Sequence, residues 1–189
     1  MMKFLTALSG LVLLAYPLAV YYGLNRWGIG VIAGLLGVLF LIRIIAGNRT
    51  RLTELKYIAW LSGGAGIILT IFATIFKQQG WFTFYPIIVS ALMFILFGSS
   101  LWQKQTLVER LARLQDPDLP PSGVQYTRTV TKVWCGYFVL NGSIALYTCF
   151  QPIEIWMLYN GLLSYICGGS LFACEWVVRQ FVQKKHQQQ

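Results

Sequence analysis

Residues 83–102 have the sequence TFYPIIVSALMFILFGSSLW, which contains no charged side chain. A helix of about 20 residues rises roughly 30 Å, the thickness of the hydrocarbon core of a bilayer. Apolar stretches of similar length recur along the 189-residue chain. The sequence therefore predicts a single all-α, polytopic membrane domain over residues 1–189. It is expected to be a six-helix transmembrane bundle with spans at 4–23, 28–47, 57–76, 83–102, 129–150 and 155–178.

The segments between these spans differ in length and in charge. Short connectors at 24–27, 77–82 and 151–154 alternate with longer ones, and short connectors imply antiparallel neighbours. Of the 15 Lys and Arg residues, only Arg26 and Lys77 fall on the side of the short connectors. Basic segments stay cytoplasmic, so both termini are predicted to be cytoplasmic, including the basic tail at 179–189.

A formal net charge of +9 is also compatible with a nucleic-acid binder. Here the basic residues lie where membrane topology and anionic lipid headgroups would place them. We therefore expect the bilayer and its anionic headgroups as partners, and no nucleic acid.

The sequence lacks the motifs of common catalytic sites, including G-x-S-x-G, H-E-x-x-H and the P-loop. Its single His is in the polar tail, and its four Cys form no C-x-x-C pair. The prediction is a non-enzymatic protein with no catalytic, cofactor-binding or metal-binding residues. Glu175 and Arg179, one helical turn apart near the cytoplasmic interface, are predicted to pair, and they are the candidates if the chain holds a lipid phosphate.

Two asparagines are the candidate polar residues inside the predicted spans. Asn141 is expected about 18 Å into its span, where its amide needs a partner such as Ser90 or Ser164. Asn160, one turn into the last span, is expected to pair with Tyr147. The interpretation is an interhelical hydrogen bond; the alternative is a polar pocket between the last two spans.

The cytoplasmic segment 103–128 contains an amphipathic stretch from Lys104 to Gln115. Its apolar face is predicted to consist of Leu107, Val108, Leu111 and Leu114. Such a stretch is typical of a helix in the membrane interface. It is interpreted either as a solvated extension of the fourth span or as a docking surface for a protein partner, to which Arg110 and Arg113 would contribute.

Small and aromatic residues suggest where helices meet each other and the membrane surface. Gly30 with Gly34, Ala59 with Gly63, and the run from Gly63 to Gly66 allow close helix packing. Pro17 is expected to kink the first span. An outer aromatic rim is interpreted as an interfacial belt, or alternatively as a substrate gate; it comprises Trp27, Trp81, Phe82, Tyr85 and Trp156.

The last two spans carry a pattern of aromatic and apolar residues: Trp134, Phe138, Leu146 and Tyr147, then Glu154, Ile155 and Trp156 across the short turn. Over residues 80–178 this pattern resembles the intracellular septation protein A family of bacterial inner-membrane proteins. Where that family tends to carry an Asn before the Leu-Tyr pair, this chain has Ala145, and Asn141 falls one turn earlier. A distant branch with a different role is the alternative to membership.

The resemblance implies a multi-pass protein of the bacterial inner membrane that supports cell-envelope synthesis or division through a membrane-protein partner. A non-enzymatic scaffold or accessory protein is therefore the leading hypothesis. The alternative is a small carrier or flippase for a lipid-like molecule, suggested by Asn141, Pro17 and the aromatic rim.

Overall fold

The computed structural model describes residues 28–47, 53–76 and 79–187. The predicted span 4–23, Pro17 and Trp27 lie outside this range. Every regular element within it is helical, as predicted: α2 (Gly28–Gly47), α3 (Thr53–Phe76), the 3-10 helix η1 (Gln79–Phe84), α4 (Tyr85–Ser100), α5 (Leu107–Arg113), α6 (Pro121–Thr148), α7 (Ile153–Leu158), the π-helix η2 (Tyr159–Leu163) and α8 (Ser164–Gln187).

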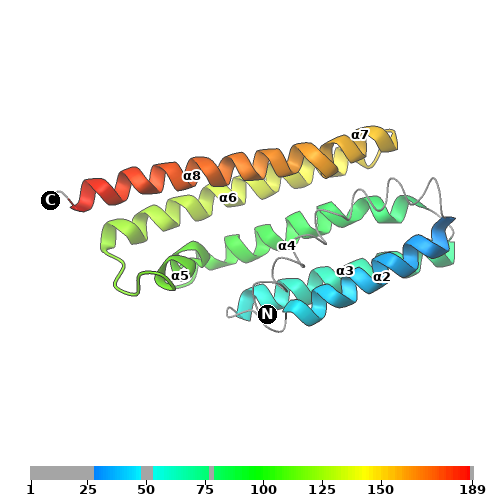
Figure 1. Cartoon of the computed structure of the whole chain (residues 1–189), viewed down its shortest axis with the longest axis horizontal. Helices are drawn as coiled ribbons and strands as arrows, with labels where there is room; N and C mark the ends of the chain where they lie inside the picture. The colour runs from blue at the N-terminus through cyan, green and yellow to red at the C-terminus, as the bar shows by residue number, and fades with distance from the viewer. Residues whose placement is uncertain (1–27, 48–52, 77–78, 188–189) are drawn as a thin grey trace.

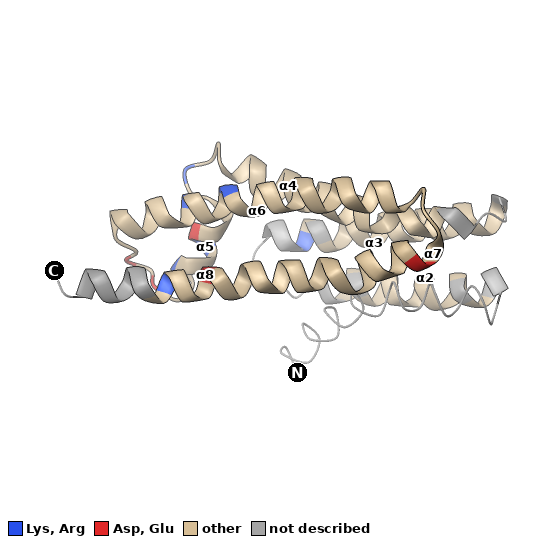
Figure 2. Cartoon of the chain, turned by 90° about the horizontal axis from the view of Figure 1, so that it is seen from above, with Lys and Arg blue, Asp and Glu red and all other residues tan. Residues whose placement is uncertain are grey.

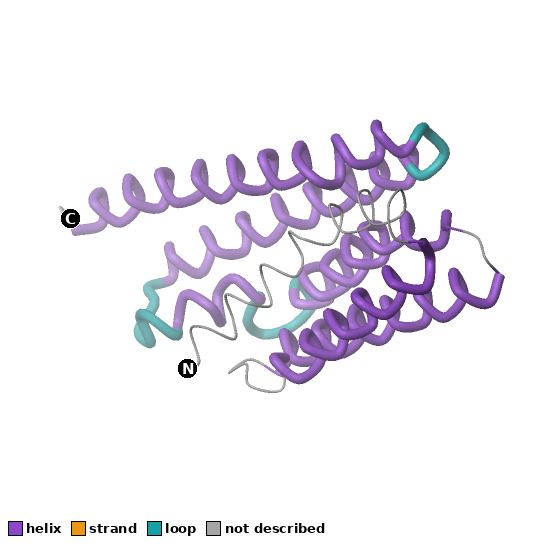
Figure 3. Tube along the Cα trace, turned by 45° about the vertical axis from the view of Figure 1, so that its right-hand side comes forward, coloured by secondary structure: helices purple, strands orange, loops and turns teal. Residues whose placement is uncertain are grey.

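The long helices run along one common axis, with the short helices α5 and α7 at opposite ends (Figure 1). Helix α3 packs against α2 and α4, and α4 packs against α6. Helix α8 continues α7 through η2 and lies beside α6. The described loops at 114–120 and 151–152 lie at opposite ends of the bundle (Figure 3).

Two described segments are long and apolar enough to cross a membrane by length and composition, Trp81–Ser100 and Ile153–Gln180. Shorter apolar helical segments occur at Ala33–Ile42 and Ala59–Ile75. Helix α6 carries Arg128, Lys132 and several threonines in its first half, which lowers its hydropathy. The structure thus confirms the all-helical class and identifies two membrane-length helices.

Several helices begin or end at residues other than those predicted from the sequence. Helix α6 begins at Pro121, eight residues before the predicted span, because proline is favoured in the first helical turn. The amphipathic stretch forms a helix only at Leu107–Arg113, where the Thr106 side chain caps it by accepting from the Glu109 backbone N–H at 3.3 Å.

The buried core lies toward the end of the bundle that holds α7. It combines residues from α2, α3, η1, α4 and α7: Leu36, Phe40, Leu69, Ala73, Phe82, Tyr85 and Trp156. Three of these were assigned to the outer aromatic rim, yet Phe82, Tyr85 and Trp156 are 0%, 3% and 1% exposed. The belt interpretation is wrong for them, because η1, the start of α4 and α7 direct these side chains into the core.

Helices α2 and α3 approach closely at two glycines of α3. A Cβ atom on Gly66 would lie 2.4 Å from the Phe40 ring, and one on Gly63 would lie 2.6 Å from Ile44. Gly34 and Gly37 of α2 play no such part, since a Cβ on either would meet nothing within 4 Å. The run of small residues in the third predicted span therefore makes the contact.

Candidate functional site

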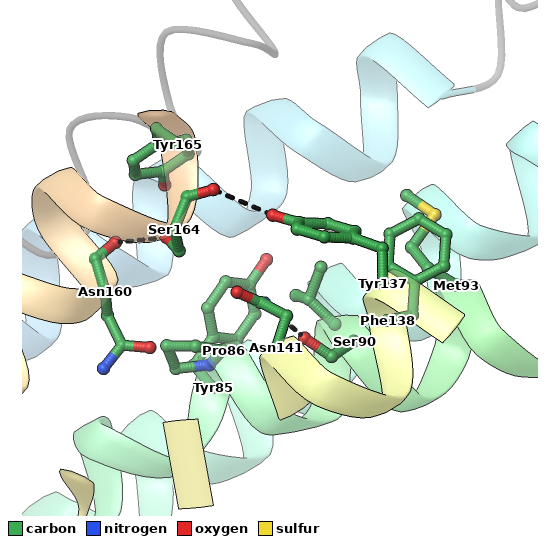
Figure 4. A pocket seen from close by; sticks show the side chains of 11 residues that line it. Tyr85, Pro86, Ser90, Met93, Tyr137, Phe138, Asn141, Asn160, Ser164 and Tyr165 are labelled. Carbon is green, nitrogen blue, oxygen red and sulfur yellow. Dashed lines mark hydrogen bonds between the residues drawn. The ribbon is translucent and has the colours of Figure 1, made fainter. Parts of the chain in front are cut away.

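A partly enclosed pocket of about 180 Å³ lies between α4, α6 and the turn that joins α7 to α8 (Figure 4). Its lining residues are neutral and mix aromatic, apolar and polar side chains: Tyr85, Pro86, Val89, Ser90, Met93, Tyr137, Phe138, Asn141, Asn160, Ser164 and Tyr165. Both candidate asparagines line it, so the polar pocket of the sequence interpretation exists. Helix α4 forms a third wall in addition to the last two predicted spans.

Asn141 connects the helices around this pocket. Its Nδ2 donates to Ser90 Oγ on α4 at 3.0 Å, and its Oδ1 accepts from the Tyr159 hydroxyl at 3.1 Å. The predicted bond to Ser90 is confirmed. Next to Asn141, a Cβ atom on Gly142 would lie 3.2 Å from Ser90 Cβ, so the small glycine permits the approach of α4 and α6 at this level.

Asn160 is 3% exposed, and within the described part of the chain only the nitrogen of its side-chain amide has hydrogen-bond partners. Its Nδ2 donates to Thr148 Oγ1 at 3.0 Å and to the Trp156 carbonyl at 2.9 Å. The predicted partner Tyr147 is wrong, because Tyr147 is 63% exposed and the neighbouring Thr148 faces Asn160. Among the described residues, no donor reaches the buried Oδ1 of Asn160.

Asn160 lies in the π-helix η2, where the Ser164 N–H bonds to the Tyr159 carbonyl, five residues back. The carbonyl of Asn160 accepts from Ser164 Oγ at 3.3 Å, and the Ser164 carbonyl accepts from the Tyr137 hydroxyl at 2.8 Å (Figure 4). Single π-turns inside α-helices occur frequently at functional sites. Sequence reasoning missed this turn and Tyr137, since hydropathy carries no signal for a one-residue insertion in a helix.

Charged residues gather elsewhere, at the end of the bundle that contains α5, whereas α7 at the opposite end carries Glu154 (Figure 2). Arg113 Nε donates to Glu109 Oε1 at 3.0 Å, and its guanidinium also reaches the Pro117 carbonyl at 2.8 Å. Arg110 donates to Gln103 Oε1. Both arginines are thus bound within their own segment.

The apolar face predicted for the amphipathic stretch is partly wrong. Leu107 and Ala112 are buried together with Glu109, which is 3% exposed, whereas Leu111 and Leu114 are exposed. Because the helix is short and capped at Thr106, it packs with a different rotation against α6. Leu111 and Leu114 therefore face away from the bundle.

The predicted ion pair of Glu175 with Arg179 does not form between these two described residues. The Tyr126 hydroxyl lies 3.3 Å from Glu175 Oε1, while Arg179 donates to Gln115 Oε1 at 3.2 Å. Burial raises the pKa of Tyr126 to about 12, and the adjacent Glu175 carboxylate adds to the rise. The phenol therefore stays protonated at neutral pH and donates its proton toward α8.

The described part of the chain contains no group of three or more His, Cys, Asp or Glu that could hold a metal ion. Cys135, Cys149, Cys167 and Cys174 are free thiols. Of these, Cys149 donates to the Thr83 carbonyl at 3.2 Å, close to the core and outside the pocket.

Comparison with protein-family models, with curated proteins and with solved structures found no match to this chain. The resemblance of residues 80–178 to the septation protein A family therefore stays a prediction that rests on the aromatic pattern alone.

Proposed function

We propose that this chain is a non-enzymatic scaffold or accessory protein of the bacterial inner membrane, where it supports cell-envelope synthesis or division. In this proposal it has six spans with both termini in the cytoplasm, and it binds a membrane-protein partner. The resemblance supplies the process and the compartment.

The main observation behind the proposal is the exposed apolar surface of α7, η2 and α8. In the membrane-length segment Ile153–Gln180, only 6% of the apolar window is buried inside the structure. Exposed side chains follow most of its length, among them Leu162, Ile166, Phe172, Trp176 and Val178. Apolar patches of this extent are typical of surfaces that contact lipid or another protein.

The distribution of charge supports the orientation. Basic residues of the described part gather at the α5 end (Figure 2), which is the end predicted to be cytoplasmic. There they can also contact anionic headgroups, each worth about 1 kcal/mol near the surface. The lining of the pocket, mostly apolar and aromatic with a few polar groups, supports a binding role.

The α5 end offers the surface that we assign to the partner. Trp102, just before the segment 103–128, is 86% exposed, and Leu111 and Leu114 within that segment are exposed as well. Exposed aromatic and aliphatic residues next to arginines are characteristic of protein interfaces. This segment is short, capped and internally bonded, so it presents a preorganised surface.

A photo-crosslinking residue tests this docking surface at Leu114, with Leu158 as the matched control. The two leucines are 54% and 51% exposed but lie at opposite ends of the bundle. In native membranes, we expect a discrete protein adduct from Leu114 and only lipid adducts from Leu158. Identical adducts from both positions, or lipid alone from Leu114, would overturn the scaffold proposal.

Charge reversal at Arg110 provides the accompanying variant. Arg110→Glu is expected to reduce the Leu114 protein adduct severalfold, since interface charges steer association. Arg113→Glu is a poorer choice, because it would place a second carboxylate beside the buried Glu109 and disturb α5 itself. If Arg110→Glu restores the function of a strain that lacks this protein as fully as wild type does, and the Leu114 adduct is unchanged, docking does not depend on this charge.

A second candidate function, a small carrier or flippase for a lipid-like molecule, is favoured by the pocket that contains Asn141. Asn141→Leu removes the bonds to Ser90 and Tyr159 without opening a cavity, so a carrier should lose transport while the chain stays folded. A scaffold should show only a stability change of about 1 kcal/mol. Movement of fluorescent lipid across vesicles distinguishes the two, with exposed Ser143→Leu on α6 as the control.

A further inference from the structure

We propose that the pocket between α4, α6 and η2 is a binding site for a neutral lipid alcohol, whose hydroxyl donates a hydrogen bond to Oδ1 of Asn160. This inference goes beyond the scaffold role, because a scaffold needs no ligand. It also supplies a ligand class for the second candidate function.

The orientation of the Asn160 amide is determined by its partners. The Trp156 carbonyl can only accept, and Thr148 Oγ1 gives its own proton to the Ala145 carbonyl at 2.8 Å. Both groups therefore require the amide nitrogen, whose two hydrogens they consume. A flipped amide would oppose two acceptors with its oxygen, so Oδ1 must face the other way.

That oxygen lacks a donor within the described structure although the side chain is 3% exposed. Figure 4 shows the Asn160 amide with its oxygen turned toward the side of the pocket that Pro86 and Tyr85 line. A buried acceptor without a donor is costly, and over nine-tenths of buried polar groups in proteins are paired. Oδ1 can only accept, so the missing group must be a donor.

The remaining walls determine what carries this donor. The lining residues are uncharged, so a charged ligand would remain unpaired in an apolar setting. Pro86, Val89, Met93 and Phe138 provide apolar walls, and a methionine adapts readily to an alkyl chain. A neutral hydroxyl attached to an apolar chain satisfies both requirements.

The size and depth of the pocket fit the hydroxyl end of a lipid alcohol. A volume of about 180 Å³ is smaller than the pockets that enclose whole drug-sized ligands. Asn160 follows the start of α7 by seven residues, which is about 10 Å along a helix. A hydroxyl held at that depth leaves its apolar chain to extend along the bundle.

The test is competitive binding of two probes to the full chain in lipid nanodiscs, measured by native mass spectrometry. Oleyl alcohol and oleyl methyl ether share the same chain, but only the alcohol can donate. We expect the alcohol to bind wild type about tenfold more tightly, as pairing a buried acceptor should give. Asn160→Leu should bind both probes equally.

Asn160→Leu could lose binding simply because it misfolds, so a pair of matched variants tests the pocket without changing Asn160. Val89→Phe fills the pocket while leaving the bonds of Asn160 in place, whereas Val139→Phe makes the same change on α6 at a side chain that is 48% exposed. Val89→Phe should lose the preference for the alcohol, and Val139→Phe should retain it.

Equal binding of the two probes to wild type would overturn the proposal, because it would mean that water alone satisfies Asn160. Equal behaviour of the two Val→Phe variants would overturn it as well, since the alcohol would then bind outside the pocket. Either result leaves the Leu114 crosslinking experiment unaffected, so failure of the ligand site and failure of the scaffold proposal are distinguishable.

Discussion

Trp156→Ala is expected to destabilise the folded bundle by about 3–5 kcal/mol. The indole is 1% exposed in the core cluster, and its Nε1 donates to the Thr83 carbonyl at 3.0 Å. Truncation leaves a cavity and removes one of the donors to the Thr83 carbonyl, which keeps the weaker bond from the Cys149 thiol. Asn160 also bonds to the Trp156 backbone, so the pocket should loosen with the core.

Thermal unfolding in detergent measures this effect, and Trp102→Ala is the matched control. Trp102 is 86% exposed, so its loss should change stability by no more than about 0.5 kcal/mol. Similar losses at the two tryptophans would contradict the burial that the structure assigns to Trp156. They would instead favour the interfacial belt expected from the sequence.

Gly66→Ala is the second change with a large expected effect, a destabilisation of about 1–3 kcal/mol. The new Cβ would lie 2.4 Å from the ring of Phe40, which is itself 2% exposed in the core. Phe40 also contacts the Tyr85 ring in a tilted arrangement with a centroid distance of 4.8 Å, so the Phe40 ring has little room to move away. The α2–α3 contact should therefore open.

Gly64→Ala is the control on the same helix. A Cβ at Gly64 meets nothing within 4 Å, so this change should be neutral or stabilise the helix by up to about 1 kcal/mol. The two alanine variants are thus predicted to differ in sign when their unfolding is compared. A gain of stability in both would show that α2 does not approach α3 at Gly66.

The helical architecture was largely predictable, because it depends on local properties. Long uncharged apolar stretches form helices, and prolines determine where some begin, as Pro121 does for α6. Clustering of basic residues at the α5 end follows directly from their positions between apolar stretches (Figure 2). The shortness of α5 and the early start of α6 were missed, since capping and packing override a weak amphipathic pattern.

The candidate site was predictable only in part. The depth of Asn141 along its span predicted a polar partner, with Ser90 or Ser164 as candidates, and the structure shows the bond to Ser90 at 3.0 Å. Asn160 was identified as a polar residue, but its assigned partner was wrong, because a π-turn rotates the helix at this point. The separate partners of Glu175 and Arg179 were missed for another reason. Each is bound by a residue more than 40 positions away in sequence, and helical periodicity predicts only neighbours one turn apart.

The sequence by itself determined the helical class, the connector pattern and the separation of basic from apolar segments. These properties follow from the transfer free energy of each side chain and from short-range backbone preferences. Only the tertiary structure decided which face of each helix is covered, that Trp156 and Tyr85 are core residues, and that Asn160 lines a pocket while its buried Oδ1 has no donor among the described residues. Those features depend on helix rotation, and a single-turn insertion or a cap changes rotation without changing hydropathy.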